Sequence, residues 1–174
     1  MTITEIRRDK RAQVRLMLDG TEGPLLHART VAESPYGVGR ELSEAELTAL
    51  IARSAYDRAH DRALYLLGMR DYTRRELVRK LTEEAPPEVA QAVAERLTAV
   101  GLLNDEAYAE RRAQALSRGK HLPRRRVAQE LMRRCIDRDT AKNAAEELEI
   151  DDFQQALALL QKKYYNSLVK VSKR

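Results

Sequence analysis

Arginine is the residue type whose spacing in this 174-residue chain suggests chemistry. Arg124, Arg125 and Arg126 stand in a row directly after Pro123, a residue that favours the start of a helix. The amino terminus of a helix carries about half a positive charge, so an exposed cation there costs about 0.3–1 kcal/mol. The same terminus presents free N–H groups that attract anions. The triplet therefore indicates an acidic partner, either phosphate groups or the carboxylates of a protein groove.

A solvated helix face is the alternative interpretation, with Glu130 pairing Arg126 one turn away. An earlier helix also begins with two arginines, which favours a function, although common descent of a repeat explains that coincidence too. On a helical wheel, Arg126 and Arg133 form a solvent stripe, while the other two members of the triplet crowd the helix start. We expect these basic residues to face a partner: Arg74, Arg75, Arg79, Arg111, Arg112, Arg124, Arg125, Arg126, Arg133 and Arg134.

Catalytic and metal-binding patterns are missing from the sequence. His27, His60 and His121 are scattered without the spacing of metal ligands. The segment "DGTEGP" has neither the spacing nor the Lys–Ser/Thr ending of a phosphate-binding loop. No Ser/His/Asp order indicates a hydrolase, and Cys135 is expected to be a buried structural residue. We therefore expect no enzymatic activity, no cofactor and no metal site.

Charge is arranged in blocks along the chain, whose formal net charge is +5. Residues 105–138 contain ten basic residues and five acids, and residues 139–152 contain six acids and one lysine. Such blocks indicate charged faces, and they keep a direct DNA- or RNA-binding helical-repeat protein open as an alternative function. The single cysteine excludes an internal disulfide, and no signal peptide or long apolar run is visible. We therefore expect a cytoplasmic protein that does not enter a membrane.

The elements that must position the arginines begin with a short β region. The segment "AQVRLMLDG" (12–20) alternates apolar and polar residues with a period of two, as a strand does. A small antiparallel sheet is therefore expected. Its elements are a first strand over 2–8 that turns at Asp9–Lys10, the strand over 12–20, a turn at Gly20, Gly23 and Pro24, and a partner strand over 24–32.

From Ser43 onward the pattern is helical. The segment "LSEAEL" is a capping box with Ser43 as N-cap and Glu46 three residues later, and "YTRREL" repeats the device with Thr73 and Glu76. Glycines and prolines mark the remaining helix ends and starts. The expected helices cover 44–67, 74–84, 87–100, 105–118, 123–134, 138–149 and 152–169.

When the sequence is aligned with itself at an offset of fifty residues, the predicted helices of the first unit align with those of the second. The aligned apolar pairs are Ala59 with Ala109, Ala63 with Ala113, Leu66 with Leu116, Leu77 with Val127 and Leu81 with Leu131. Helical repeats stack into extended bodies. We therefore predict a mainly α fold of tandem three-helix repeats, forming an elongated curved body after a small N-terminal antiparallel β element. The expected domains are a β extension with its connector (1–38), a linking helix with the first unit (39–101), the second unit (102–150) and the first helix of an incomplete third unit (151–174).

Three segments, in this order and spacing, resemble the RecX family of regulators of the bacterial recombinase RecA. They are "RALYLLGMRDYTRRELVRKL" (62–81), "GLLNDEAYAERRA" (101–113) and "LPRRRVAQELMRRCI" (122–136). The N-terminal "ITEI", "LDG" and "GRELSEAEL" resemble the β-containing extension of part of that family. The chain departs from the family at Cys135 and near Leu122, where glycine is common, and in its third unit, which usually continues for two more helices.

The resemblance implies a non-enzymatic protein that binds the RecA filament along its groove, with single- or double-stranded DNA in the filament as a further contact. Members of the family commonly inhibit ATP hydrolysis, strand exchange and co-protease activity. We therefore expect a monomer that modulates, and most readily inhibits, RecA in homologous recombination, DNA repair and the SOS response. If the third unit contributes to filament binding, this chain is expected to bind with reduced affinity.

Overall fold

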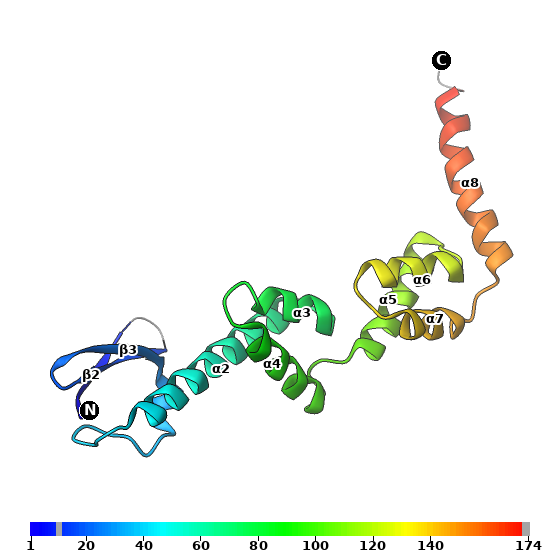
Figure 1. The fold of residues 1–174 in the computed structure, drawn as a ribbon. Helices are drawn as coiled ribbons and strands as arrows, with labels where there is room; N and C mark the ends of the chain where they lie inside the picture. The colour runs from blue at the N-terminus through cyan, green and yellow to red at the C-terminus, as the bar shows by residue number, and fades with distance from the viewer. Residues whose placement is uncertain (10–11, 172–174) are drawn as a thin grey trace. The chain divides into compact units, whose positions relative to one another are not determined.

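The computed structural model describes residues 1–9 and 12–171, with side chains described to residue 165 in the last helix. Two compact units make up the chain. The first contains Met1–Arg70 and Leu77–Arg96, and the second contains Asp71–Glu76 and the chain from Leu97 onward. The fold is mainly helical after a small sheet, as the sequence predicts (Figure 1).

The N-terminal sheet has three antiparallel strands in the order β1-β2-β3, which confirms the predicted type of sheet. The strands are β1 (Ile3–Arg8), β2 (Gln13–Leu18) and β3 (Thr21–His27). Their buried face packs Ile3, Leu16 and Leu26 against apolar residues at the start of the first long helix. The expected turn at Asp9–Lys10 lies partly outside the described residues.

The turn between β2 and β3 is shorter than predicted. Asp19 and Gly20 form it, both with positive φ, of 48° and 79°. Gly23 and Pro24, expected in the turn, lie within β3 instead. Gly23 is needed there for another reason, because a Cβ at this position would lie 2.8 Å from the Leu16 carbonyl oxygen. A glycine required for close approach between strands looks like a turn glycine in the sequence.

The predicted strand over 24–32 is wrong in its second half, where helix α1 (Ala28–Ala32) begins directly after β3. The His27 side chain starts this helix by accepting a hydrogen bond from the Arg29 backbone N–H at 3.3 Å. The His27 backbone N–H donates to Ser54 Oγ at 2.7 Å. These hydrogen bonds end the strand, and an apolar–polar pattern does not reveal them.

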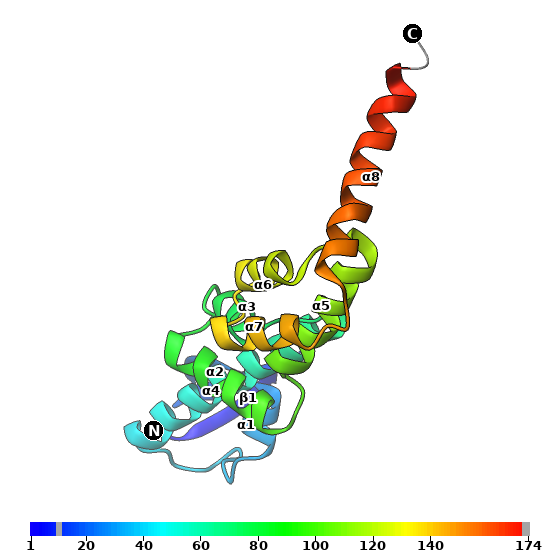
Figure 2. The ribbon, with the colours of Figure 1, turned by 90° about the vertical axis from the view of Figure 1, so that its right-hand side faces the viewer.

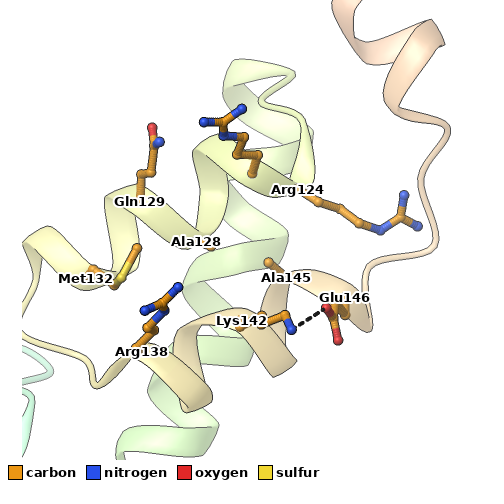
Figure 3. Close-up of a pocket in the computed structure, with 9 residues that line it drawn as sticks. Arg124, Ala128, Gln129, Met132, Arg138, Lys142, Ala145 and Glu146 are labelled. Carbon is orange, nitrogen blue, oxygen red and sulfur yellow. Dashed lines mark ion pairs between the residues drawn. The ribbon is translucent and has the colours of Figure 1, made fainter.

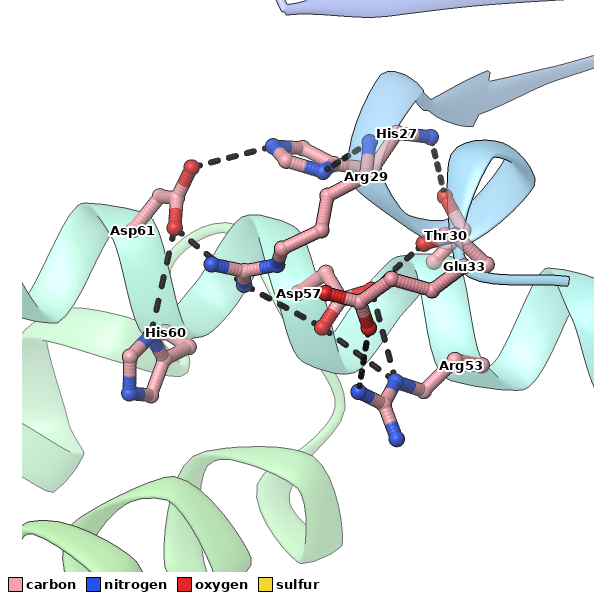
Figure 4. Close-up of polar contacts among 9 residues, drawn as sticks. His27, Arg29, Thr30, Glu33, Arg53, Asp57, His60 and Asp61 are labelled. Carbon is pink, nitrogen blue, oxygen red and sulfur yellow. Dashed lines mark hydrogen bonds and ion pairs between the residues drawn. The ribbon is translucent and has the colours of Figure 1, made fainter.

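A buried carboxylate joins α1 to the long helix α2 (Glu44–Met69), as Figure 4 shows. Asp57 is 1% exposed and accepts hydrogen bonds from the Thr30 hydroxyl at 2.6 Å and from Arg29 at 3.2 Å. Arg53 reaches the same carboxylate at 3.3 Å from one turn earlier in α2. Burial alone raises the pKa of Asp57, but the Thr30 hydroxyl and the two guanidinium groups outweigh it and hold that pKa below its ordinary value.

The remaining helices confirm the predicted set, with ends that differ by three residues at most. Both predicted capping boxes are present. Ser43 Oγ accepts from the Glu46 N–H at 3.2 Å, and Thr73 Oγ1 accepts from the Glu76 N–H at the same distance. The helices are α3 (Arg74–Leu81), α4 (Pro87–Ala99), α5 (Asp105–Lys120), α6 (Arg124–Arg133), α7 (Arg138–Glu146) and α8 (Asp152–Val171).

The fifty-residue repeat is confirmed by burial, because both members of every aligned apolar pair are less than 9% exposed. In the second unit, α5, α6 and α7 lie side by side in both views of the molecule (Figures 1 and 2). Their shared core includes Tyr108, Leu116, Val127, Leu131 and Leu148.

Residues in the left-handed conformation end several helices. Gly101 has φ 75° after α4, His121 has φ 53° after α5 and Cys135 has φ 64° after α6. Cys135 is half-buried rather than fully buried as expected. Its positive φ gives a physical reason for the glycine that RecX-like sequences usually carry there, since glycine adopts this conformation without steric penalty. Gly68 and Gly119 lie inside α2 and α5, because these helices extend two residues beyond the ends predicted at residues 67 and 118.

Two glycine-to-alanine substitutions are expected to change stability in opposite directions. Gly68 is helical and Gly101 has φ 75°, and an added Cβ meets nothing within 4 Å at either position. Gly68→Ala should raise the free energy of unfolding by about 0.5–1 kcal/mol, and Gly101→Ala should lower it by about 1 kcal/mol. Urea unfolding followed by circular dichroism measures both, and a shift of the same sign for the two variants would contradict the assigned conformations.

Asp57→Ala is expected to lower the free energy of unfolding by about 2–3 kcal/mol, because it removes charged hydrogen bonds from a buried site. The effect should depend on pH. Since the folded-state pKa of Asp57 lies below its ordinary value, the carboxylate stabilises the fold fully above pH 4–5 and loses this effect as pH falls further. Unfolding measured at pH 7 and in acid should therefore show the variant and the parent converging in acid, with the exposed Asp139→Ala as control.

Candidate functional site

The start of helix α6, where the arginine triplet begins, is occupied by a carboxylate of the chain itself. The Arg124 backbone N–H donates to Asp152 Oδ1 at 3.0 Å, and the Arg124 guanidinium lies 3.5 Å from Asp152 Oδ2. The guanidinium also donates to the Leu148 carbonyl. Asp152 is the first residue of α8. The anion that offsets the positive charge at this helix start is therefore internal.

The same arrangement occurs one repeat earlier. The Arg74 backbone N–H, at the start of α3, donates to Asp105 Oδ1 at 2.7 Å, and Asp105 is the first residue of α5. In each case the middle helix of one repeat is capped by the first aspartate of the next repeat, and we call these two contacts the aspartate caps. Burial raises the pKa of Asp105, and the hydrogen bond from Arg74 offsets this only in part.

Two further candidate arginines bind the segment Asp71–Glu76. Arg111 Nη2 lies 3.1 Å from Asp71 Oδ2, and Arg134 Nη1 lies 4.0 Å from Glu76 Oε1. The Thr73 hydroxyl also donates to the Arg134 carbonyl at 3.2 Å. These contacts give Arg111 and Arg134 a structural role in holding this segment, although the exposed pair of Arg111 with Asp71 contributes only about 0–1 kcal/mol.

The outer face of α6 carries the solvent stripe that the helical wheel indicates. Arg126 donates to Gln129 Oε1 at 3.1 Å, and Arg133 pairs with Glu130 at 2.7 Å. The predicted pairing of Glu130 with Arg126 is therefore wrong, because Glu130 engages the arginine three residues later. Both guanidinium groups stay at the surface.

The ten predicted partner-facing residues are divided between the two compact units. Arg79 belongs to the first compact unit, and the other nine belong to the second. Arg75 and Arg125 are exposed and Arg112 is half-buried. Arg74, Arg111, Arg124 and Arg134 make contacts with other helices or with the segment Asp71–Glu76, whereas Arg126 and Arg133 contact only their own helix and stay at the surface.

A groove between α6 and α7, of about 340 Å³, was not anticipated from the sequence (Figure 3). Its floor is formed by Ala128, Met132 and Ala145. Basic side chains border it from both helices, and the only acid among its lining residues, Glu146, pairs with Lys142 at 3.6 Å. We call this feature the α6–α7 groove, and its basic border consists of Arg124, Arg125, Arg138 and Lys142.

One signal for the groove is present in the sequence, in the spacing of the basic residues on α7. Arg138 and Lys142 are one turn apart on α7 and flank an alanine-rich face, but Lys142 lies in residues 139–152, a segment that is acidic overall. Within the described residues, no group of His, Cys, Asp or Glu side chains could hold a metal ion. No helix in the same part of the chain is long and apolar enough to cross a membrane.

Family models match both three-helix units. Residues 59–97 match the first three-helix domain of RecX, and residues 104–144 match its second three-helix domain. A regulatory protein RecX from Cronobacter sakazakii is 34% identical over 123 residues, which cover 64% of this chain and 74% of that protein. This chain belongs to the RecX family.

Other relatives agree on the family and on the fold. The regulatory protein RecX of Clostridioides difficile is 28% identical over 72% of this chain, and the aligned region spans 60% of that protein's length. A crystal structure of a regulatory protein RecX superposes with a TM-score of 0.69 at 22% identity, covering 84% of this chain and 73% of the other. The tandem three-helix architecture is thus the RecX fold.

Removing the second aspartate cap is expected to destabilise the α6 start. Asp152→Ala deletes the carboxylate on the Arg124 N–H and should lower the free energy of unfolding by about 1 kcal/mol. Asp152→Asn keeps an acceptor oxygen and should lower the free energy of unfolding by less than Asp152→Ala does. Amide hydrogen exchange at residues 124–127 localises the effect, with Asp139→Ala as the control. Faster exchange in the control than in Asp152→Ala would contradict the role of the cap.

Proposed function

We propose that this chain binds the RecA–DNA filament and inhibits the ATPase, strand-exchange and co-protease activities of RecA. Its setting would be homologous recombination, DNA repair and the SOS response in the bacterial cytoplasm. Membership of the RecX family, with matches in both three-helix domains, is the observation that carries this proposal. The chain acts as a monomeric regulator without a cofactor.

The distribution of the arginines supports a partner with negative charge. Arg75, Arg125, Arg126 and Arg133 are exposed in the second compact unit, and the carboxylates of the aspartate caps do not bind their guanidinium groups. A filament of protein on DNA offers both carboxylates and phosphates to such side chains. The long-range attraction of these charges raises the rate of encounter.

Inhibition requires that the chain prefer one state of the filament. A ligand shifts a conformational equilibrium only by its differential affinity for the two states. A three-helix repeat that contacts neighbouring RecA protomers would bind best when they keep one spacing, and it would oppose the subunit movements coupled to ATP turnover. Contacts through two repeats act together because they share one chain.

The direct test is RecA ATP hydrolysis on single-stranded DNA, measured while this protein is titrated to stoichiometric excess. We expect a saturable fall in the hydrolysis rate with filaments still present by electron microscopy. Unchanged hydrolysis with intact filaments would contradict the proposal. Titration of naked DNA at several salt concentrations separates the alternative, since direct phosphate contacts give a linear fall of log K with log salt.

Charge reversal at Arg125 and Arg126 is expected to weaken filament binding by about tenfold, as the loss of about 1.4 kcal/mol predicts. Helix content and melting temperature should stay unchanged, because both side chains are exposed. Arg7→Glu with Arg8→Glu, on the exposed edge of β1, is a control of equal charge change. Equal binding by the parent and the Arg125/Arg126 variant would show that these two residues form only a solvated helix face and do not contact the filament.

A further inference from the structure

We propose that the α6–α7 groove is a binding site for an acidic protein segment that inserts one long apolar side chain between flanking carboxylates. The site lies wholly within the second three-helix unit. The proposal goes beyond RecA regulation, because it concerns what this groove recognises on any partner and is tested with this chain alone.

The floor of the groove favours an apolar group. Ala128 and Met132 come from α6 and Ala145 comes from α7, and the two small alanine side chains leave space for the groove. Met132 is 40% exposed, so part of the floor is apolar surface open to solvent. A methionine is unbranched and polarisable, and it adapts its shape to an inserted side chain. Burying this floor under a leucine or similar side chain removes apolar surface from water.

The border of the groove favours carboxylates. Arg124 is bound to Asp152 and Lys142 is paired with Glu146, so these two cations already have partners. Arg125 on α6 and Arg138 on α7 line the groove and make no ion pair with a carboxylate of the described chain. Figure 3 shows the Arg138 side chain in the space between the two helices, close to Met132. One unpaired guanidinium therefore comes from each of the two helices.

The apolar floor and the basic border together favour a peptide over a nucleic acid as the ligand. A nucleic acid would satisfy Arg125 and Arg138 with phosphates but would leave the apolar floor unused. Single strands bind through aromatic side chains on which bases stack, and no aromatic residue lines the groove. An acidic segment with an apolar residue at its centre matches both the floor and the border. A guanidinium also binds a carboxylate through two parallel hydrogen bonds, which fixes the orientation of the segment.

The test is fluorescence anisotropy with a labelled synthetic peptide that has one leucine between two pairs of glutamates. Arg125→Glu with Arg138→Glu should weaken its binding by about tenfold or more, because two charge pairs are lost. The matched control is Arg7→Glu with Arg8→Glu, which makes the same charge change on exposed side chains of β1 in the first compact unit and should alter the affinity by less than about twofold. Circular dichroism verifies that both variants fold.

Two altered ligands complete the experiment. A peptide with alanine in place of the leucine should bind about fivefold more weakly at the same salt concentration, because the apolar contact is lost. An oligothymidine of equal charge should bind more weakly than the peptide. The proposal is overturned if the peptide does not bind, if the control weakens binding as much as the groove variant, if the leucine is dispensable, or if the oligothymidine binds more tightly. Each of these outcomes is independent of RecA inhibition, which is measured separately.

Discussion

A carboxylate at the first residue of one repeat, bound to the first backbone N–H of the middle helix of the repeat before it, is the interaction on which the repeat architecture depends. The α3 and α6 helices both begin with arginines, which oppose the charge of a helix amino terminus. The aspartate caps supply the missing negative charge from the following repeat, through Asp105 and Asp152. The start of each middle helix is thereby capped only when the first helix of the following repeat is in place, so local helix formation and repeat stacking support one another.

Most of the fold can be predicted from the sequence because its signals are local. The capping boxes at Ser43 and Thr73 and the 3.6-residue spacing of leucine and alanine act within one or two turns. The fifty-residue repeat adds evidence because a buried position in one unit predicts a buried position in the other, as Leu77 and Val127 show. Helix boundaries followed from these signals to within one turn.

The wrong predictions concern positions whose structure is determined by contacts between residues far apart in the sequence. The chain leaves β3 at His27 because Ser54 and Asp57, about thirty residues later, bind the backbone and side chains of this region. Gly23 sits in a strand because the opposite strand approaches closely. The candidate site shows the same limit. The wheel placed Arg126 and Arg133 correctly at the surface, but it did not reveal that Asp152 occupies the helix start, or that α7 completes a groove.

The left-handed residue at the end of α6 has a practical consequence. Cys135 is the only thiol in the chain, and its left-handed backbone leaves the side chain half-buried next to Arg134, whose carbonyl binds Thr73. A thiol-reactive fluorophore would therefore attach at one atom per molecule without mutation of any other residue. It would sit where the segment Asp71–Glu76 meets α6 within the second compact unit, and its emission would report on solvent access at that contact.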